Sequence, residues 1–405
     1  MRTDFDVVAV GAGPAGTAAV FRLHQRGYRV LLIDKSVFPR SKPCGGGITI
    51  KALKLLPWSA APVLETATRR LRMGVTGGRS RRDSVFETDG HVCTFAVRAK
   101  FDAFNLGKVV QAGVAFEPAA GLSSIAEDEG CVRVTIGTRT VIAKYLVGAD
   151  GANSTVRRLT GMAPSFHRGF AIEGIVANDA VQVPIITEFL FGEVGNGYGW
   201  MFPKGDHVNV GIFTWDSAVS LGKDRLREYV RHRLGIDAVS DIIGFPIGFG
   251  GRDYVQDRER IVLAGDAGGF AEPLLGEGIH NAIKSGQAAA DAIVAVETGE
   301  AASLRTAYQR AITPIRDDLA TYERAKRLFY GRLDTIGYRA LAFPLVRSAM
   351  MRGFAAGMTL HEITHPFPFS LMYLASPLFR RSAPIRLPSS LDRAADRAGA
   401  LPARQ

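Results

Sequence analysis

The fold class follows from residues 5–34, which read FDVVAVGAGPAGTAAVFRLHQRGYRVLLID. This stretch contains a short apolar run, a glycine-rich turn, a helical pattern over residues 14–25 and a second apolar run that ends in Asp34. This order is typical of a Rossmann-like α/β fold, in which glycines let a phosphate approach the turn and let the helix pack on the strand. The free N–H groups at the start of such a helix attract phosphate. The sequence therefore predicts a bound dinucleotide, with the Asp34 carboxylate on a ribose.

The composition is that of a folded protein with more than one domain. The chain has 405 residues, of which 47% are apolar and 22% charged, and this balance excludes a disordered chain. Three cysteines are too few for a disulfide framework or a four-thiolate iron–sulfur cluster. They favour a reducing compartment. We expect neither a secretory signal nor a spanning helix, and we predict a cytoplasmic protein.

Three later segments combine glycines with acidic residues, two of them where strands are expected to end and the third where a long helix is expected to begin. They read VGADG at residues 147–151, GD at residues 265–266 and PLLGEGI at residues 273–279. Together with the first turn, they resemble the large glutathione-reductase type of FAD proteins, in the branch that contains aromatic hydroxylases and geranylgeranyl reductases. The resemblance implies FAD as the cofactor. It also implies that the helix after residue 278 points its N-terminus at the flavin, where the helix dipole stabilises the negative charge of the reduced ring.

The same resemblance assigns individual residues to the cofactor. Arg98, in the segment VRAKFD, matches an arginine that the family places near FAD, and a surface ion pair is the alternative role for it. The implied FAD-binding residues are Gly11, Gly13, Pro14, Ala15, Gly16, Asp34, Lys35, Arg40, Cys44, Gly45, Arg98, Asp150, Gly265, Asp266, Pro273, Gly276, Gly278 and Ile279.

Two further segments indicate the chemistry. The loop KPCGGG, residues 42–47, resembles the geranylgeranyl reductase loop whose cysteine lies beside the flavin ring. The strand YGWMFP, residues 198–203, resembles the motif that lines the substrate cavity of that family, with Gly195 in place of a leading proline. Alternation puts its three aromatic side chains on one face of the strand. A packing thiol and an ordinary sheet core are the alternatives. The expected catalytic residues are Cys44 and Tyr198, and the expected substrate-binding residues are Trp200, Phe202 and Gly47.

The resemblance implies an FAD-dependent oxidoreductase that hydrogenates C=C bonds of a geranylgeranyl or other polyprenyl chain. Such an alkene needs a hydride from the flavin and a proton from a nearby acid. Cys44, Tyr198 and a bound water are candidates for that acid, and we favour Cys44. The expected partners are a prenyl diphosphate, a prenylated quinone or a prenyl lipid as substrate, and NAD(P)H or ferredoxin as reductant. The alternatives are a flavin monooxygenase or halogenase on the same fold, and a non-catalytic flavoprotein that binds prenyl lipids.

Residues 361–365, HEITH, spell a metalloprotease zinc pattern. That site needs a continuous helix and a third ligand. Pro366 disfavours helical geometry at His365, and no His or Glu follows it in the chain. We therefore expect no metal site.

The net charge of +11 is concentrated near the C-terminus, since the chain from Leu304 onward has 16 Arg and Lys against 7 Asp and Glu. Between residues 339 and 381 the arginines alternate with Phe, Met and Leu. This mixture suits an anionic membrane surface, on the inner face of a membrane, better than nucleic acid. Ordinary helical packing is the alternative. A second basic cluster suits a diphosphate or phospholipid head group, or a solvated face; it consists of Arg69, Arg70, Arg72, Arg79, Arg81 and Arg82.

The expected fold class is α/β, with a Rossmann-like FAD-binding domain, an antiparallel-sheet substrate domain and a helical C-terminal region. We assign residues 1–70, 97–165 and 257–300 to the FAD-binding domain, residues 71–96 and 166–256 to the substrate domain, and residues 301–405 to the basic helical region. Within the substrate domain we expect strands over residues 169–177, 187–191, 199–202 and 208–213, and a helix over residues 223–234.

Overall fold

The computed structural model divides into two compact units. The first consists of Met1–Ser41, Ala99–Arg168 and Ile247–Ala320, and the second of Lys42–Arg98, Gly169–Pro246 and Thr321–Gln405. The residues whose structure is described are 3–77, 80–119, 121–163, 165–331, 337, 339, 343–367, 369–376, 385 and 387–391. The three-part functional division expected from the sequence stays a prediction.

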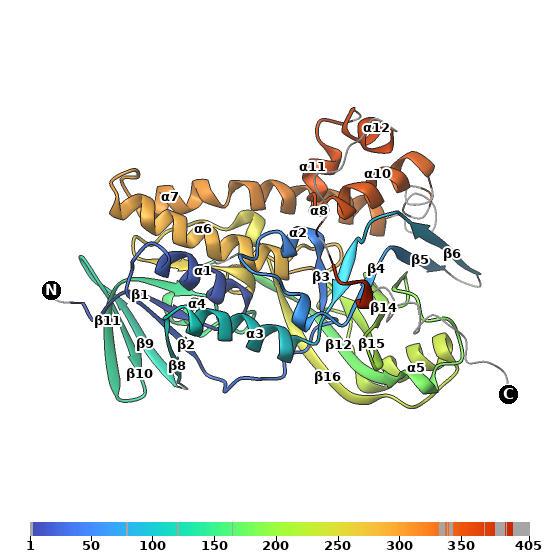
Figure 1. Ribbon diagram of the computed structural model, residues 1–405, viewed down its shortest axis with the longest axis horizontal. Coiled ribbons are helices and arrows are strands. Elements are labelled where there is room, and N and C mark those ends of the chain that lie inside the picture. Colours follow the sequence, from blue (N-terminus) through green and yellow to red (C-terminus); the bar gives the residue numbers. More distant parts are fainter. Residues whose placement is uncertain are drawn as a thin grey trace. The chain divides into compact units, whose positions relative to one another are not determined.

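The first unit is built on a seven-stranded sheet (Figure 1). In spatial order its strands are β8 (Ala115–Pro118), β2 (Val30–Asp34), β1 (Phe5–Val10), β11 (Arg139–Gly148), β10 (Val132–Ile136) and β9 (Leu122–Glu127), with β17 (Ile261–Leu263) also paired to β11. Strands β8, β2, β1, β11 and β17 run parallel, whereas β9, β10 and β11 pair antiparallel. The expected Rossmann-like arrangement is therefore confirmed.

Helices cover this sheet, and two of them pack closely on each other. They are α1 (Pro14–His24), α3 (Arg98–Gln111), α4 (Thr155–Thr160), α6 (Ile279–Glu297) and α7 (Leu304–Ala311), with short 3-10 turns η3 (Gly251–Asp253) and η4 (Gly265–Ala267). Helices α1 and α6 lie side by side (Figure 1). A Cβ on Gly286 of α6 would lie 2.1 Å from the carbonyl oxygen of Ala15 in α1, so only glycine permits this approach.

The second unit contains a larger, mostly antiparallel sheet. In spatial order its strands are β16 (Ser240–Phe249), β12 (His167–Ala177), β15 (His207–Thr214), β14 (Gly197–Pro203), β13 (Glu188–Phe191), β5 (Arg70–Gly77) and β6 (Ser80–Glu87). The pair β5–β13 is parallel. A small sheet is formed, in spatial order, by β3 (Gly47–Thr49), β7 (Cys93–Phe95) and β4 (Thr66–Thr68). The unit also contains α2 (Ile50–Leu53) and the 3-10 turns η1 (Ala61–Val63) and η2 (Asn178–Ala180). The expected strands are confirmed.

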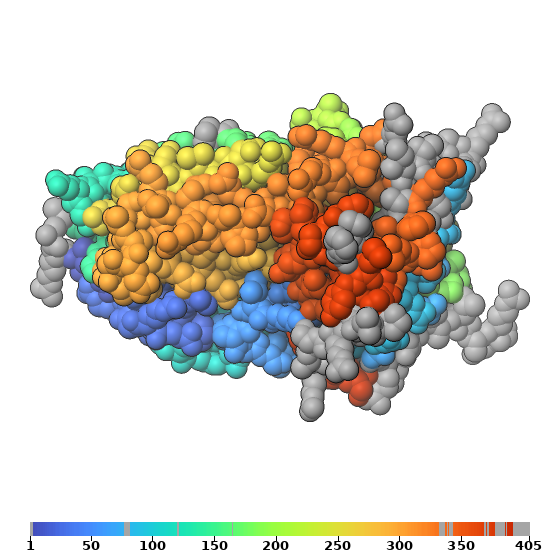
Figure 2. Space-filling view, turned by 90° about the horizontal axis from the view of Figure 1, so that it is seen from above, coloured from blue at the N-terminus to red at the C-terminus, as the bar shows by residue number. Residues whose placement is uncertain are grey.

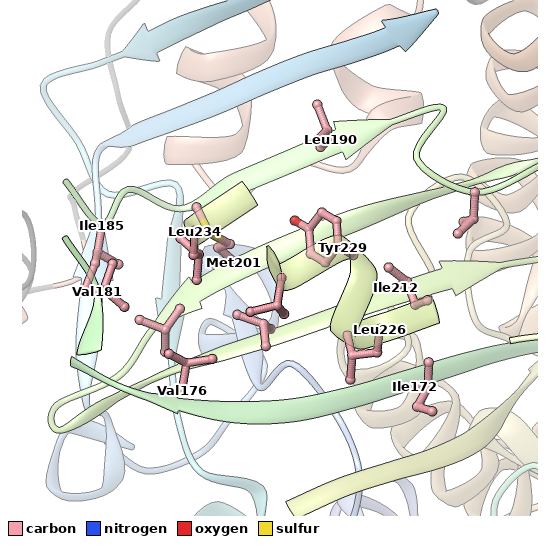
Figure 3. Close-up of a cluster of buried hydrophobic side chains, with 14 residues drawn as sticks. Ile172, Val176, Val181, Ile185, Leu190, Met201, Ile212, Leu226, Tyr229 and Leu234 are labelled. Carbon is pink, nitrogen blue, oxygen red and sulfur yellow. The ribbon is translucent and has the colours of Figure 1, made fainter. Parts of the chain in front are cut away.

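One face of the larger sheet packs against α5 (Lys223–Leu234), which begins and ends where the sequence predicts (Figure 3). Alternate residues of β12, β14 and β15 form this apolar core together with Leu226 and Tyr229 of the helix. Gly199 of β14 makes room for the Tyr229 ring, because a Cβ there would lie 2.4 Å from it. The aromatic side chains of β14 lie on the opposite face of the sheet.

The C-terminal helices are α8 (Thr313–Gly331), α10 (Pro344–Ala355), α11 (Leu360–Thr364) and α12 (Phe369–Ala375). Ala349, Ile363 and Leu374 form a small core among the last three, and Figure 2 shows α10 and α11 (red-orange) at the surface. Large apolar side chains are exposed at Phe343 and at Phe367, which is 71% exposed. No described helix is long and apolar enough to cross a membrane. Several residues of the two basic clusters lie outside the described structure or have undescribed side chains: Arg79, Arg81, Arg380 and Arg381.

Candidate functional site

Four of the segments predicted to hold the cofactor lie where strands end at one edge of the first sheet. Strand β1 leads into Gly11, β2 ends in Asp34, β11 leads into Asp150 and β17 leads into Gly265. These four strands are parallel, so their carboxyl ends meet at the same edge. In open parallel sheets this edge is where ligands bind.

The glycines of the first turn have different neighbours. Gly11 has φ +106°, and a Cβ on it would lie 2.3 Å from the carbonyl oxygen of Ala149. A Cβ on Gly16 would lie 1.8 Å from the carbonyl oxygen of Gly11. At Gly13, however, the nearest atom to a Cβ would be Nη2 of Arg40, 3.6 Å away. The protein itself therefore leaves open space at Gly13, and this space fits the approach of a cofactor phosphate.

The electrostatics of this turn favour an anion. Pro14 is the first residue of α1 and no side chain caps the helix, so the positive end of its dipole is available for a phosphate. Arg40, beside Gly13, forms an ion pair of 3.1 Å with the buried carboxylate of Asp102. The Asp34 carboxylate accepts hydrogen bonds from the backbone N–H groups of Ala12 (2.7 Å) and Ser36 (2.8 Å). Each of its oxygens keeps a lone pair for a ribose hydroxyl.

The structure also describes two other predicted cofactor residues, Lys35 and Arg98. Lys35 is exposed, directly after β2. Arg98 is buried and belongs to the second unit, at the first residue of α3. The Arg98 side chain is therefore not at the surface, and its role at the cofactor stays a prediction.

Asp150 organises the start of α4. Its carboxylate accepts hydrogen bonds from the hydroxyl of Ser154 and from the backbone N–H groups of Thr155 (2.6 Å) and Val156 (3.1 Å). Burial nevertheless raises the pKa of Asp150, although these hydrogen bonds oppose the shift. Arg157 of the same helix donates a hydrogen bond of 2.9 Å to the carbonyl oxygen of Ala267. The Asp150 motif is thereby tied to the η4 turn.

Asp266 lies in the η4 turn, next to the start of α6. A Cβ on Gly278, the residue before that helix, would lie 3.0 Å from Oδ1 of Asp266. The hydroxyl of Ser285 in α6 accepts a hydrogen bond from the Gly265 N–H (2.8 Å). The turn is thus fixed on α6, with a carboxylate at the helix N-terminus. This geometry suits hydrogen bonding to the hydroxyls of a cofactor.

The loop before α6 is held by an acidic residue that the sequence analysis missed. Glu272 is fully buried, and its carboxylate accepts hydrogen bonds from the backbone N–H groups of Leu274 (2.7 Å) and Leu275 (2.8 Å). It fixes the conformation of Pro273 and Gly276, and Gly276 has φ +73°. The only local signal was an acidic residue immediately before a Pro-rich and Gly-rich loop.

In the second unit, the loop over residues 42–47 packs on the aromatic face of β14. A Cβ on Gly45 would lie 2.7 Å from the Phe202 ring and 3.2 Å from Nε1 of Trp200. Gly46 has φ +67°, and a Cβ on it would lie 2.0 Å from the carbonyl oxygen of Ala96. Gly47 begins β3, where a Cβ would meet only ordinary contacts. The glycines at 45 and 46 are therefore required by neighbours within the protein.

The structure brings the predicted aromatic residues together on one face. The rings of Tyr198 and Trp200 lie 6.1 Å apart, and those of Trp200 and Phe202 lie 6.0 Å apart. All three side chains are buried. A Cβ on Gly211 of β15 would lie 2.1 Å from the Trp200 ring, so the indole lies across a position that has no side chain.

A charged cluster that the sequence did not reveal surrounds Cys44. The Cys44 N–H donates a hydrogen bond of 2.8 Å to Oε1 of Glu173 in β12. The amine of Lys204, at the end of β14, donates to the carbonyl oxygens of Gly45 (2.7 Å) and Ala96 (3.1 Å). Complete burial lowers the pKa of Lys204 to about 8, although the nearby Cys44 and Glu173 oppose the shift. The cation of this loop is thus Lys204, whereas Lys42 lies over the Phe245 ring.

The zinc-like pattern does not form a continuous helix. Helix α11 ends at Thr364, and His365 is extended (φ −123°), as Pro366 predicts. The Glu362 carboxylate accepts the Thr359 N–H in a capping box at the helix start. Among the described residues, no group of three or more His, Cys, Asp or Glu side chains is placed to hold a metal ion.

Comparison with known proteins gives the family. Residues 4–321 match the FAD binding domain family. A protein of Methanosarcina barkeri named only as uncharacterized is 33% identical, over 92% of this chain and 94% of its own. A menaquinone reductase of Mycolicibacterium smegmatis is 31% identical, over 72% of this chain and 76% of its own. A digeranylgeranylglycerophospholipid reductase of Methanopyrus kandleri is 30% identical, over 76% of this chain and 81% of its own.

A solved structure supports the fold. A geranylgeranyl bacteriochlorophyll reductase-like protein of Thermoplasma acidophilum has a TM-score of 0.68 at 21% identity, covering 93% of this chain and 96% of its own. The α/β class and the FAD cofactor expected from the sequence are confirmed. The chain belongs to the FAD binding domain family of oxidoreductases, in its geranylgeranyl reductase branch.

Proposed function

We propose that this FAD-dependent oxidoreductase hydrogenates C=C bonds in the prenyl chain of its substrate. The observation that carries the proposal is the aromatic face of β14, on which Trp200 and Phe202 contact the Cys44 loop through Gly45. Such a face suits an apolar chain and excludes water from a reacting alkene. The names of two relatives, a menaquinone reductase and a digeranylgeranylglycerophospholipid reductase, support a reductase of this class.

The residues of the first unit bind and orient the cofactor in this proposal. The α1 N-terminus, with Gly13 and Arg40, takes the pyrophosphate, and Asp34 takes a ribose. Asp266 takes hydroxyls of the ribityl chain, and the N-terminus of α6 stabilises negative charge on the flavin. When bound, reduced FAD supplies the hydride.

The residues of the second unit bind the substrate and deliver the proton. Trp200 and Phe202 contact the prenyl chain, and their π faces stabilise positive charge that develops on the alkene. Cys44 and Tyr198 stay our sequence-based candidates for the acid. The β14 face contacts only the prenyl chain, so it does not select among substrates with different head groups.

The test is anaerobic incubation of the dithionite-reduced protein with geranylgeranyl diphosphate, menaquinone and a geranylgeranyl glycerolipid in separate reactions. Mass spectrometry is expected to show two hydrogens gained per reduced bond in at least one of them. The proposal is refuted if all three are recovered unchanged while the flavin stays reduced. Tightly bound but unchanged prenyl lipid would indicate a carrier, and oxygen uptake stimulated by an aromatic substrate would indicate a monooxygenase or halogenase.

A further inference from the structure

A half-buried carboxyl group, that of Glu173, lies on the same face of the large sheet as the aromatic residues of β14. The register pairs Glu173 of β12 with Gly211 of β15, and Gly211 with Trp200 of β14. Residues paired directly across neighbouring strands point to the same face. Glu173 and Trp200 therefore point to the same face of the sheet, on either side of Gly211. Because Gly211 has no side chain, the Trp200 indole can lie over it.

Two donors hold this carboxyl in place, Cys44 and Asn209, and a third donor, Trp200, fixes the orientation of Asn209. Trp200 Nε1–H donates a hydrogen bond of 2.7 Å to Oδ1 of Asn209. This bond fixes the orientation of the Asn209 amide, whose NH₂ group then donates to Glu173. On the other side, Oε1 of Glu173 accepts the Cys44 N–H. The carboxyl is thus connected to both segments that resemble the family: the Cys44 loop and the β14 strand.

No ion pair neutralises Glu173 among the described residues. The charged groups around it are Lys204, at the end of β14, and Arg98, at the start of α3, and both act on it only through space. The Lys204 amine donates its hydrogen bonds to the carbonyl oxygens of Gly45 and Ala96. Because a buried carboxylate without a contacting cation is unfavourable, burial raises the pKa of Glu173 above the ordinary glutamate value. The proton shares the carboxyl with the hydrogen bonds from the Cys44 N–H and the Asn209 amide.

We propose that Glu173 is the acid that supplies the proton for alkene reduction, with Asn209 and Trp200 as its positioning residues. This inference rests on the proposed function. The O–H bond of the Glu173 carboxyl breaks as a C–H bond forms at one alkene carbon, while the other carbon takes the hydride from reduced FAD. The alkene is reduced, the flavin is oxidised, and water reprotonates the Glu173 carboxylate. Cys44 then has the role of fixing its loop on the carboxyl.

The variant Glu173→Gln tests this directly. It keeps an oxygen that can accept the Cys44 N–H and removes the acid. A positioned general acid contributes about 10²–10⁴-fold to a rate, so we expect single-turnover alkene reduction to fall by at least about 100-fold while FAD still binds and is reduced by dithionite. Glu173→Asp, which restores an acid, is expected to recover part of the rate. The matched variant Cys44→Ala is expected to lose less than about tenfold.

Infrared difference spectroscopy of the protein gives a second readout that does not depend on turnover. Wild type is expected to show the carbonyl stretch of a protonated carboxyl at neutral pH, shifted in D₂O and absent from Glu173→Gln. The same band in Glu173→Gln would assign it to another residue and overturn the inference. So would a Glu173→Gln rate equal to wild type, or a loss confined to Cys44→Ala. Failure of wild type to reduce any prenyl substrate would refute the proposed function instead, and the infrared band would still show whether Glu173 holds a proton.

Discussion

Replacing Gly13 with alanine separates cofactor binding from folding at the first glycine-rich turn. A Cβ at Gly13 would meet only Nη2 of Arg40, 3.6 Å away. The backbone there is already in an extended conformation (φ −79°) that alanine adopts readily. We therefore expect the apoprotein to keep its stability or to gain about 0.4–1 kcal/mol, because alanine restricts the unfolded chain. The same methyl group would stand where the cofactor phosphate approaches.

The matched variant is Gly11→Ala, two residues earlier. Its φ of +106° is unfavourable for alanine, and its Cβ would lie 2.3 Å from the carbonyl oxygen of Ala149. Backbone strain of about 1–2 kcal/mol and overpacking of about 1–3 kcal/mol give an expected destabilisation of about 2–5 kcal/mol. This variant should therefore lose stability with or without FAD.

For Gly13→Ala we expect a loss of FAD affinity instead. If two charge-assisted hydrogen bonds to phosphate are lost, at about 1.5 kcal/mol each, the dissociation constant rises about 100-fold. Thermal unfolding of the apoprotein and titration of FAD fluorescence measure the two quantities. A Gly13→Ala protein that binds FAD as wild type does, or that unfolds as early as Gly11→Ala, would refute this account of the turn.

Three further changes test other parts of the structure. Gly211→Ala puts a Cβ 2.1 Å from the Trp200 ring, so it should abolish prenyl reduction while FAD absorbance is retained; normal turnover would argue against a role for the indole. Glu188 is fully buried and paired with Arg233 (2.6 Å) and Arg72 (3.4 Å), and Glu188→Gln should lower the free energy of unfolding in urea by about 3 kcal/mol, since it removes the carboxylate from two half-buried cations. The pKa of Lys204 is lowered from 10.5 to about 8, so the unfolded state binds more protons between these values and stability should rise by about 3 kcal/mol from pH 8 to pH 10.5. Lys204→Met should remove that rise, and a variant with an unchanged pH dependence of unfolding would assign it to other groups.

The fold was predictable where one short segment contains the whole signal. The turn from Gly11 to Gly16 follows from a local pattern, and α5 follows from its helical periodicity. Strand β16 was not predicted, because Pro246 and two glycines interrupt its apolar alternation. Its pairing with β12 is a tertiary contact that overrides those local preferences.

Only the residues of the candidate site that belong to a sequence motif were predictable. The Cys44 loop and the β14 aromatic residues were found, but Glu173 and Lys204 were not. Their hydrogen-bond partners in the loop lie 129 and 159 residues away in the chain. The role of such a charged residue depends on how far it is buried and on its hydrogen-bond partner. A single sequence specifies neither of these. Glu272, by contrast, bonds within its own loop.

The most direct test of the proposed reductase is a single-turnover experiment without oxygen. The reduced holoprotein is mixed with each prenyl substrate, flavin absorbance is followed, and the product is counted by mass spectrometry. We predict that the flavin is reoxidised as the substrate is consumed, with one alkene hydrogenated for each flavin. Flavin that stays reduced beside every substrate, or that is reoxidised without hydrogenated product, would contradict the account.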